Sequence, residues 1–254
     1  MNPMLIKYLI VCPFVFLAGF VDAIAGGGGL ISLPAYLIAG LPAHNAIATN
    51  KMSSSMGSTA SAVKYAKEGF IPWKIALPAA AFSLGGSAIG ANLSLLIDEK
   101  VLKVILLVLI PVTAVLVLKN RILDAEKEPL PLGKTMLLAF IIAFFIGMYD
   151  GFYGPGTGTF LLVLLTSVVH MKLQEANGTK NIINLASNLS ALAVFLRSGN
   201  TWIPLGLAAG AFSIAGSYLG ARTFTGKGAK VVRPIMIAVL VVFVFRIVFD
   251  FLFT

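Results

Sequence analysis

Charged residues are scarce in this chain. Lysine, arginine, aspartate and glutamate make up 11% of the 254 residues, whereas hydrophobic residues make up 58% and the mean hydropathy is +0.95. Soluble domains carry about 25% charged residues. Apolar runs such as 104–118 and 137–148 leave no polar face for water. The composition therefore excludes one large soluble core and indicates an all-α, polytopic membrane protein.

Cysteine and histidine are also nearly absent. The single cysteine, Cys12, excludes an intramolecular disulfide, and the two histidines, His44 and His170, form no metal-ligand spacing with it. No Gly-Lys-Ser/Thr sequence follows the glycine run at 26–29, which argues against a nucleotide-binding loop and ATP-driven pumping. The net charge of +9 does not indicate nucleic acid binding, because the basic residues cluster in short loops, where they orient membrane helices. We expect no metal and no cofactor.

The sequence contains two similar halves. Residues 81–91 and 211–221 are identical at seven of eleven positions, at an offset of 130. Lys51 has a counterpart in Lys180 at an offset of 129. Two homologous halves of an apolar chain are typical of transporters built from internal repeats, whose site lies where the repeats meet.

We predict two homologous repeats of about five helical segments each, with one short or broken segment per repeat. In the first half the expected segments are 4–25, 29–41, 44–67, 73–97 and 100–119. In the second half they are 135–151, 158–170, 173–197, 202–222 and 229–251. The polar, proline-bearing linker loop 120–134 separates the first transmembrane repeat (1–119) from the second (135–254).

The short segments 29–41 and 158–170 determine the topology. At 13 residues each they would be about 20 Å long as helices, which is shorter than the hydrocarbon core of a bilayer. Re-entrant segments would leave four crossings per half and parallel repeats, whereas crossing segments would give five and inverted repeats. With five crossings, twelve basic residues lie on one face and five on the other, while four crossings split them nearly evenly. The positive-inside rule therefore favours inverted repeats with both termini outside.

Each half carries a glycine-rich break, Gly26 to Gly29 after Asp22 and Gly154 to Gly158 after Asp150. Irregular backbone survives inside a bilayer only where protein or a water-filled cavity satisfies it. The N–H groups and positive dipole end of the short helix that follows would form an anion site inside the membrane. Alternatively, each break is a tight turn that lets two helices approach. The predicted substrate contacts from the breaks are Gly27, Gly28, Gly29, Leu30, Gly156, Thr157, Gly158 and Thr159.

Lys51 and Lys180 occupy matching places in segments that are otherwise able to enter the membrane. A lysine at the centre of a membrane helix costs about 2.5–3.5 kcal/mol on insertion. We therefore predict that both lysines attract an anion, although they could instead snorkel or only pair with the acids. Asp22 and Asp150 either carry a coupling proton, because burial favours the neutral carboxyl, or cap the backbone of their glycine turns.

Polar and small residues recur in the other segments. Asn50, Asn177 and Asn181 flank the two lysines and are candidate substrate contacts, but such side chains also serve as ordinary contacts between membrane helices. The motifs at 86–90 and 216–220 place two glycines four residues apart, which allows close helix packing. Packing within one chain explains these motifs, and a homodimer face is the alternative.

The two breaks and the motifs that follow them resemble a known family. Its first-half signature is similar to Ala25-Gly-Gly-Gly-Gly-Leu-Ile-Ser-Leu-Pro34 followed by Ala48-Thr-Asn-Lys51. Its second-half signature is similar to Asp150-Gly-Phe-Tyr-Gly-Pro-Gly-Thr-Gly-Thr-Phe160 followed by Ala176-Asn-Gly-Thr-Lys-Asn181. The family is the sulfite exporter TauE/SafE family of bacterial membrane proteins. Val163 departs from the pattern, since second-half members often have proline there.

The resemblance implies a secondary transporter, and an exporter, of small sulfur-containing anions such as sulfite or organosulfonates. It also implies a multi-pass protein of the bacterial cytoplasmic (inner) membrane, with lipid and a small anion as its partners. The family is broad, so the resemblance does not select the anion, and another small organic anion is an alternative substrate. From a different class, a non-transporting membrane subunit or a passive channel is also an alternative, and the flux through a channel would not saturate.

Overall fold

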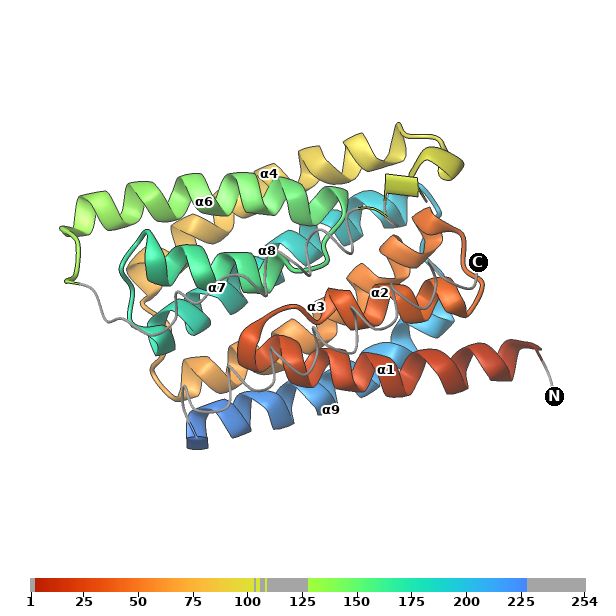
Figure 1. Ribbon diagram of the computed structural model, residues 1–254, viewed down its shortest axis with the longest axis horizontal. Coiled ribbons are helices and arrows are strands. Elements are labelled where there is room, and N and C mark those ends of the chain that lie inside the picture. Colours follow the sequence, from red (N-terminus) through yellow and green to blue (C-terminus); the bar gives the residue numbers. More distant parts are fainter. Residues whose placement is uncertain (1–2, 103, 106–107, 109–127, 228–254) are drawn as a thin grey trace.

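A computed structural model describes residues 3–102, 104–105, 108 and 128–227 of the chain. The described residues form an all-α structure without strands, which confirms the predicted fold class. Their helices are α1 (Pro3–Ala25), α2 (Gly29–Ile38), α3 (Ala43–Lys67), α4 (Trp73–Leu95), α6 (Leu132–Phe152), α7 (Thr157–Ser167), α8 (Leu173–Arg197) and α9 (Ile203–Lys227) (Figure 1). Most of the segment expected at 100–119, and all of that expected at 229–251, lies outside the described residues.

The short helices α2 and α7 are shorter than the sequence predicts. They have 10 and 11 residues, which is about 15–17 Å of helix. After α2 the chain turns at Gly40, which has a φ of +80° and follows the helix as a left-handed residue commonly does. After α7 the chain turns at His170, which has a φ of +59°. Neither helix alone spans a hydrocarbon core of about 30 Å.

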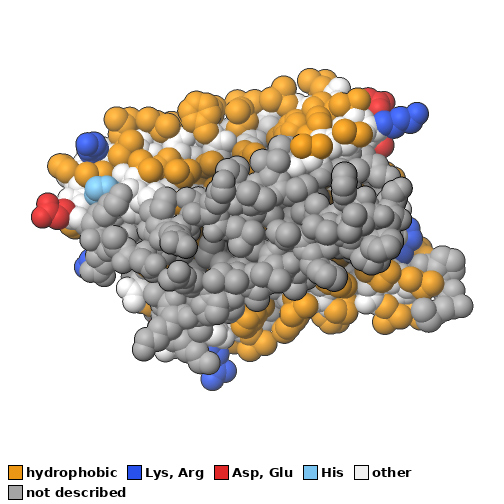
Figure 2. All heavy atoms as spheres, viewed as in Figure 1, with side chains coloured by type: hydrophobic (Ala, Val, Ile, Leu, Met, Phe, Trp, Pro, Cys, Tyr) orange, Lys and Arg blue, Asp and Glu red, His pale blue; other side chains and the backbone are white. Residues whose placement is uncertain are grey.

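Four of the described helices are long and apolar enough to cross a membrane. They are Met4–Ala25 in α1, Trp73–Leu95 in α4, Leu132–Phe152 in α6 and Ile203–Gly226 in α9. Large hydrophobic side chains on these helices are exposed, and Figure 2 shows them covering the described flanks while charged side chains lie toward the ends of the long axis. This distribution matches a multi-pass membrane protein whose apolar flanks face lipid.

The polar helices α3 and α8 lie in the interior. Each has 25 residues, or about 37 Å of helix, which is long enough to cross the bilayer. Helix α3 packs against α8 and α9, and α8 packs against α3 and α4 (Figure 1). The apolar helices therefore shield the polar side chains of α3 and α8 from lipid.

Glycines bring helices from opposite halves of the chain into backbone contact. A Cβ at Gly86 or Gly90 of α4 would overlap the backbone of α6 at Phe144 and Met148. In the same way, a Cβ at Gly216 or Gly220 of α9 would overlap the carbonyl groups of Phe16 and Phe20 of α1. Both glycine pairs thus allow close packing within one chain, between a helix of one half and a helix of the other.

The long helices form two groups, and the helices within each group are parallel. Helices α1, α3 and α9 run in one direction in Figure 1, and α4, α6 and α8 run in the other. Each group takes two helices from one half of the chain and one from the other. Matching helices of the two halves (α1 and α6, α3 and α8, α4 and α9) are therefore antiparallel, as inverted repeats require. The inverted topology stays a prediction that agrees with this arrangement.

Candidate functional site

The two glycine breaks meet at the centre of the molecule. A Cβ at Gly26 would overlap the backbone of Gly158 and Thr159, and a Cβ at Gly158 would lie 2.8 Å from the Cα of Gly26. Gly26 and Gly27 have φ values of +75° and +85°, and Gly154 and Gly156 have +98° and +85°. Such φ values favour glycine, because other residues are strained there. The two breaks are therefore tight turns that contact each other, in agreement with the alternative interpretation that each break lets two helices approach.

Asp22 caps the first break. Its Oδ1 accepts a hydrogen bond of 3.1 Å from the N–H of Gly28, and its Oδ2 accepts one of 3.3 Å from Nδ2 of Asn184 on α8. The backbone carbonyl of Asp22 also accepts the N–H of Gly26 at 3.0 Å. This geometry is the capping arrangement expected of an aspartate at a glycine turn. One N–H group near the start of α2 is therefore already bonded to a carboxylate.

Asp150 has a different partner, the buried Lys51 of α3. The Nζ of Lys51 lies 2.7 Å from Oδ2 of Asp150 and donates a hydrogen bond of 3.1 Å to Oδ1 of Asn188. The hydroxyl of Ser187 donates to the same carboxylate oxygen at 2.6 Å. Lys51 is 1% exposed and Asp150 is 2% exposed. Because burying two charges removes their hydration, the pair depends on these additional hydrogen bonds.

Lys180 of α8 is as deeply buried as Lys51 but contacts backbone. Its Nζ donates a hydrogen bond of 2.7 Å to the backbone carbonyl of Asp22, and its exposed fraction is 0%. The lysine of each half therefore contacts the aspartate of the other half. The two contacts are not equivalent, since Lys51 is held by a carboxylate and Lys180 by a carbonyl group.

Three further predicted residues link helices around the first break. The Nδ2 of Asn177 donates to the carbonyl groups of Ala23 and Ile24, each at 3.2 Å. Thr159 donates to the carbonyl of Ala25 at 3.3 Å. Asn181 accepts a hydrogen bond of 2.7 Å from Ser61 of α3. These bonds hold the end of α1, and α3, against α7 and α8.

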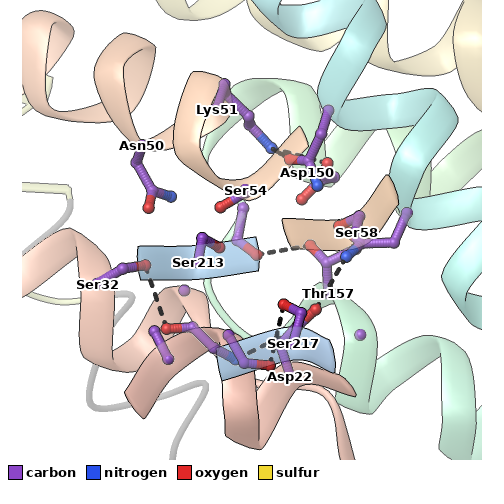
Figure 3. A pocket seen from close by; sticks show the side chains of 18 of the residues that line it. Asp22, Ser32, Asn50, Lys51, Ser54, Ser58, Asp150, Thr157, Ser213 and Ser217 are labelled. Carbon is purple, nitrogen blue, oxygen red and sulfur yellow. Dashed lines mark hydrogen bonds and ion pairs between the residues drawn. The ribbon is translucent and has the colours of Figure 1, made fainter. Parts of the chain in front are cut away.

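A small cavity lies between the breaks and the polar helices (Figure 3). The cavity has a volume of about 30 Å³, roughly two to three times what one water needs. Predicted residues that line it are Asp22, Gly28, Gly29, Asn50, Lys51, Asp150, Gly156, Thr157 and Gly158. Predicted residues outside its lining are Gly27, Leu30, Thr159, Asn177, Lys180 and Asn181. The structure thus brings the two breaks, Lys51 and both acids together around one space.

Further lining residues are not among the predicted substrate-binding and proton-coupling residues. They are Val15, Ala18, Gly19, Ser32, Ser54, Ser58, Gly154, Asn184, Asn188, Ser213 and Ser217. Their spacing is a signal that could have found several of them. Asn50, Ser54 and Ser58 recur every four residues, as do the two asparagines of α8 and the two serines of α9, so each set lies on one helix face.

The cavity offers hydrogen-bond donors of several kinds. Lys51 supplies a positive charge, and the hydroxyls of Ser54, Ser58 and Ser213 surround the same space in Figure 3. Asn50 is 6% exposed, and its Oδ1 has no hydrogen-bond partner among the described residues. A buried polar atom without a partner is costly unless a water or ligand satisfies it. Helices α2 and α7 both begin at the cavity, so their positive ends add to its affinity for an anion.

Fold and site together define a multi-pass helical membrane protein with a buried polar cavity between two similar halves. The family model described as "Sulfite exporter TauE/SafE" matches residues 11–247. The chain therefore belongs to the TauE/SafE family, as the break motifs predicted.

Relatives in this family carry transporter names. A "Probable membrane transporter protein ORF9" of Sinorhizobium sp is 34% identical over 97% of this chain and 93% of its own length. A "Probable membrane transporter protein" of Haemophilus influenzae is 32% identical over 92% of both chains. The "Probable membrane transporter protein YfcA" of Escherichia coli K12 is 29% identical over 92% of this chain and 87% of its own. No solved structure matches the chain significantly.

Proposed function

We propose that this protein is a secondary transporter that exports small sulfur-containing anions, such as sulfite or organosulfonates, across the bacterial cytoplasmic membrane. The observation that carries the proposal is the buried cavity at which both glycine breaks, two helix N-termini and Lys51 meet. The family description and the transporter names of the relatives support membrane transport. The sulfur-containing substrate rests on the family description and on the donor chemistry of the cavity.

The donors of the cavity suit a compact oxyanion. Sulfite and sulfonate each present three oxygens on one sulfur, so several donors can be used at once. The Nζ of Lys51 would bond one oxygen with charge assistance, and the hydroxyls of Ser54, Ser58 and Ser213 would bond the others. The starts of α2 and α7 would stabilise the remaining charge. In a carrier with alternating access, helices around this cavity would move to load and release the anion.

Within this proposal the two acids have different tasks. Asp22 holds the first break through Gly28 and Asn184, so its substitution acts on structure first. Asp150 is the acid that pairs with Lys51, so its protonation would release the lysine for the anion. We assign the coupling proton to Asp150 and a positioning task to Asp22 and Lys180.

A flux screen in proteoliposomes tests the proposal. Sulfite, thiosulfate, methanesulfonate, sulfoacetate and acetate are compared, with and without a pH gradient, against liposomes without protein and against Lys51→Gln protein. Lys64→Gln is the matched control, because Lys64 pairs with Glu68 at the end of α3, away from the cavity. We expect saturable flux of sulfite, methanesulfonate or both, which Lys51→Gln reduces and Lys64→Gln does not. Thiosulfate and sulfoacetate carry two charges near neutral pH, so they show whether the charge of the anion matters. Acetate flux without sulfur-anion flux, or flux that never saturates, would contradict the proposal.

A further inference from the structure

The charges around the cavity cancel one another. Lys51, Asp150 and Asp22 line it, and Lys180, outside the lining, donates a hydrogen bond to the backbone carbonyl of Asp22. Two lysines and two aspartates sum to zero when all four are charged. A bound anion therefore adds a net negative charge to a space lined mostly by buried residues, unless a positive charge arrives with it.

Asp150 is the group best placed to receive that positive charge as a proton. Its Oδ2 is shared by Lys51 at 2.7 Å and Ser187 at 2.6 Å. Of the elements packed around it, α3 presents Lys51, α8 presents Ser187 and α1 presents Asp22 across the cavity. The residues of α2 and α7 that line the cavity are glycine or hydroxyl-bearing. If Asp150 takes a proton, its attraction for Lys51 falls, and Lys51 can bond an anion in its place. Asp22 has less freedom, since both its oxygens hold backbone or amide N–H groups.

We infer that the cavity takes one singly charged anion together with one proton and rejects doubly charged anions. The inference rests on the proposed function and adds the charge class of the substrate and the stoichiometry. A proton from one side of the membrane binds the Asp150 carboxylate, and Lys51 then bonds the anion instead of Asp150. The proton and the anion are released on the other side of the membrane. The transported set, one anion and one proton, carries no net charge. A dianion would leave one negative charge buried without a partner, because Lys180 does not line the cavity.

Methanesulfonate and sulfate provide a matched pair for the test. Both are tetrahedral sulfur anions of similar size, but near neutral pH methanesulfonate carries one charge and sulfate two. Wild-type protein is reconstituted into vesicles that contain a fluorescent pH indicator, in sodium-free buffer, with the membrane potential set by potassium and valinomycin. Uptake of radiolabelled anion and acidification of the lumen are measured together.

We expect one proton for each methanesulfonate, with a rate that does not change when the membrane potential is reversed. The half-saturating concentration of sulfate should be more than about 100-fold higher, since an unpaired buried charge costs several kcal/mol. Asp150→Asn protein should move methanesulfonate without protons and in response to the potential. Glu68→Gln, an acid-to-amide change on the surface, should behave as wild type.

The outcomes separate this inference from the proposed function. Uptake of sulfate and methanesulfonate with similar constants, uptake without protons in the wild type, or a requirement for sodium would each overturn the inference while leaving the transport function intact. The wild-type comparison stands even if Asp150→Asn protein fails to fold. Absence of saturable uptake for every anion, together with absence of ligand-induced thermal stabilisation, would overturn both.

Discussion

Replacing Lys51 by glutamine tests the centre of the proposed site. Glutamine keeps a donor but removes the charge that would bond the anion. A hydrogen bond to a charged group is worth about 1.5–3 kcal/mol, so the substrate affinity should fall roughly 10- to 150-fold. The same change also leaves the Asp150 carboxylate buried at 2% exposure without its 2.7 Å partner. Breaking a buried pair in this way costs about 3–5 kcal/mol of stability, so the flux of the single variant is interpreted together with its thermal stability and with a second variant.

The double variant Lys51→Gln/Asp150→Asn removes both charges and separates the two effects. The two amide side chains that it introduces would be neutral and able to hydrogen-bond, and Ser187 would keep a partner. We therefore expect the double variant to regain most of the thermal stability lost in Lys51→Gln. Its apparent affinity for the anion should stay at least about 10-fold below that of the wild type, because the charge-assisted bond is still missing.

Lys180→Gln is the internal comparison, because Lys180 is the matching, equally buried lysine of the second half. It bonds a backbone carbonyl and does not line the cavity, so its loss should reduce stability more than affinity. The assays are thermal unfolding in detergent and concentration-dependent uptake in proteoliposomes, on the same protein preparations. Unchanged uptake constants in the folded double variant, or a larger loss of affinity in Lys180→Gln than in Lys51→Gln, would refute the reasoning.

Three further predictions address the fold. Gly158→Ala places a Cβ 2.8 Å from the Cα of Gly26 and should lower the unfolding free energy by about 1–3 kcal/mol in thermal unfolding. Gly85→Ala should not destabilise, because its Cβ would meet no described atom within 4 Å beyond its own stretch of helix. Although burial raises the pKa of Glu99, hydrogen bonds from Ala43 and His44 lower it overall. The stabilisation from these bonds is therefore present above the ordinary carboxyl pKa and is lost as the pH falls through the lowered value. Glu99→Gln should reduce the loss of thermal stability at acidic pH, and an unchanged loss would contradict this. In a Cys12→Ala background, cysteines at positions 69 and 199 should be labelled from opposite sides of the membrane, and labelling from the same side would exclude the inverted topology.

Helix positions could be predicted closely because they depend on local composition. Expected segments such as 44–67 and 173–197 match α3 and α8 to within one residue. The short segments were predicted too long, since their ends depend on the left-handed turns at Gly40 and His170. A glycine at the end of a helix predicts such a turn. A histidine with positive φ is uncommon, so the sequence does not predict the turn at His170.

The partners of the site residues could be predicted only in part. Matching positions indicated that Asp22 and Asp150 belong with Lys51 and Lys180, but not that each lysine reaches the aspartate of the other half. That crossing depends on contacts between helices more than 90 residues apart, such as Lys51 with Asn188. The serines of α9 were missed for the same reason, since their role depends on which helix they face.

The difference between matching positions bears on how such a chain can transport. Ser213 and Ser217 of α9 line the cavity, and Ser217 also donates a hydrogen bond of 3.3 Å to the carbonyl of Gly19. Their counterparts in α4, Ser83 and Ser87, donate hydrogen bonds to the carbonyl groups of Ile183 and Ser187 and do not line the cavity. Among the described residues, α9 therefore lines the cavity and its counterpart α4 does not, although α1, α3, α6 and α8 all contribute to the lining. Two similar halves held in unlike arrangements are what alternating access between inverted repeats requires, because exchanging the arrangements would move the opening from one side of the site to the other.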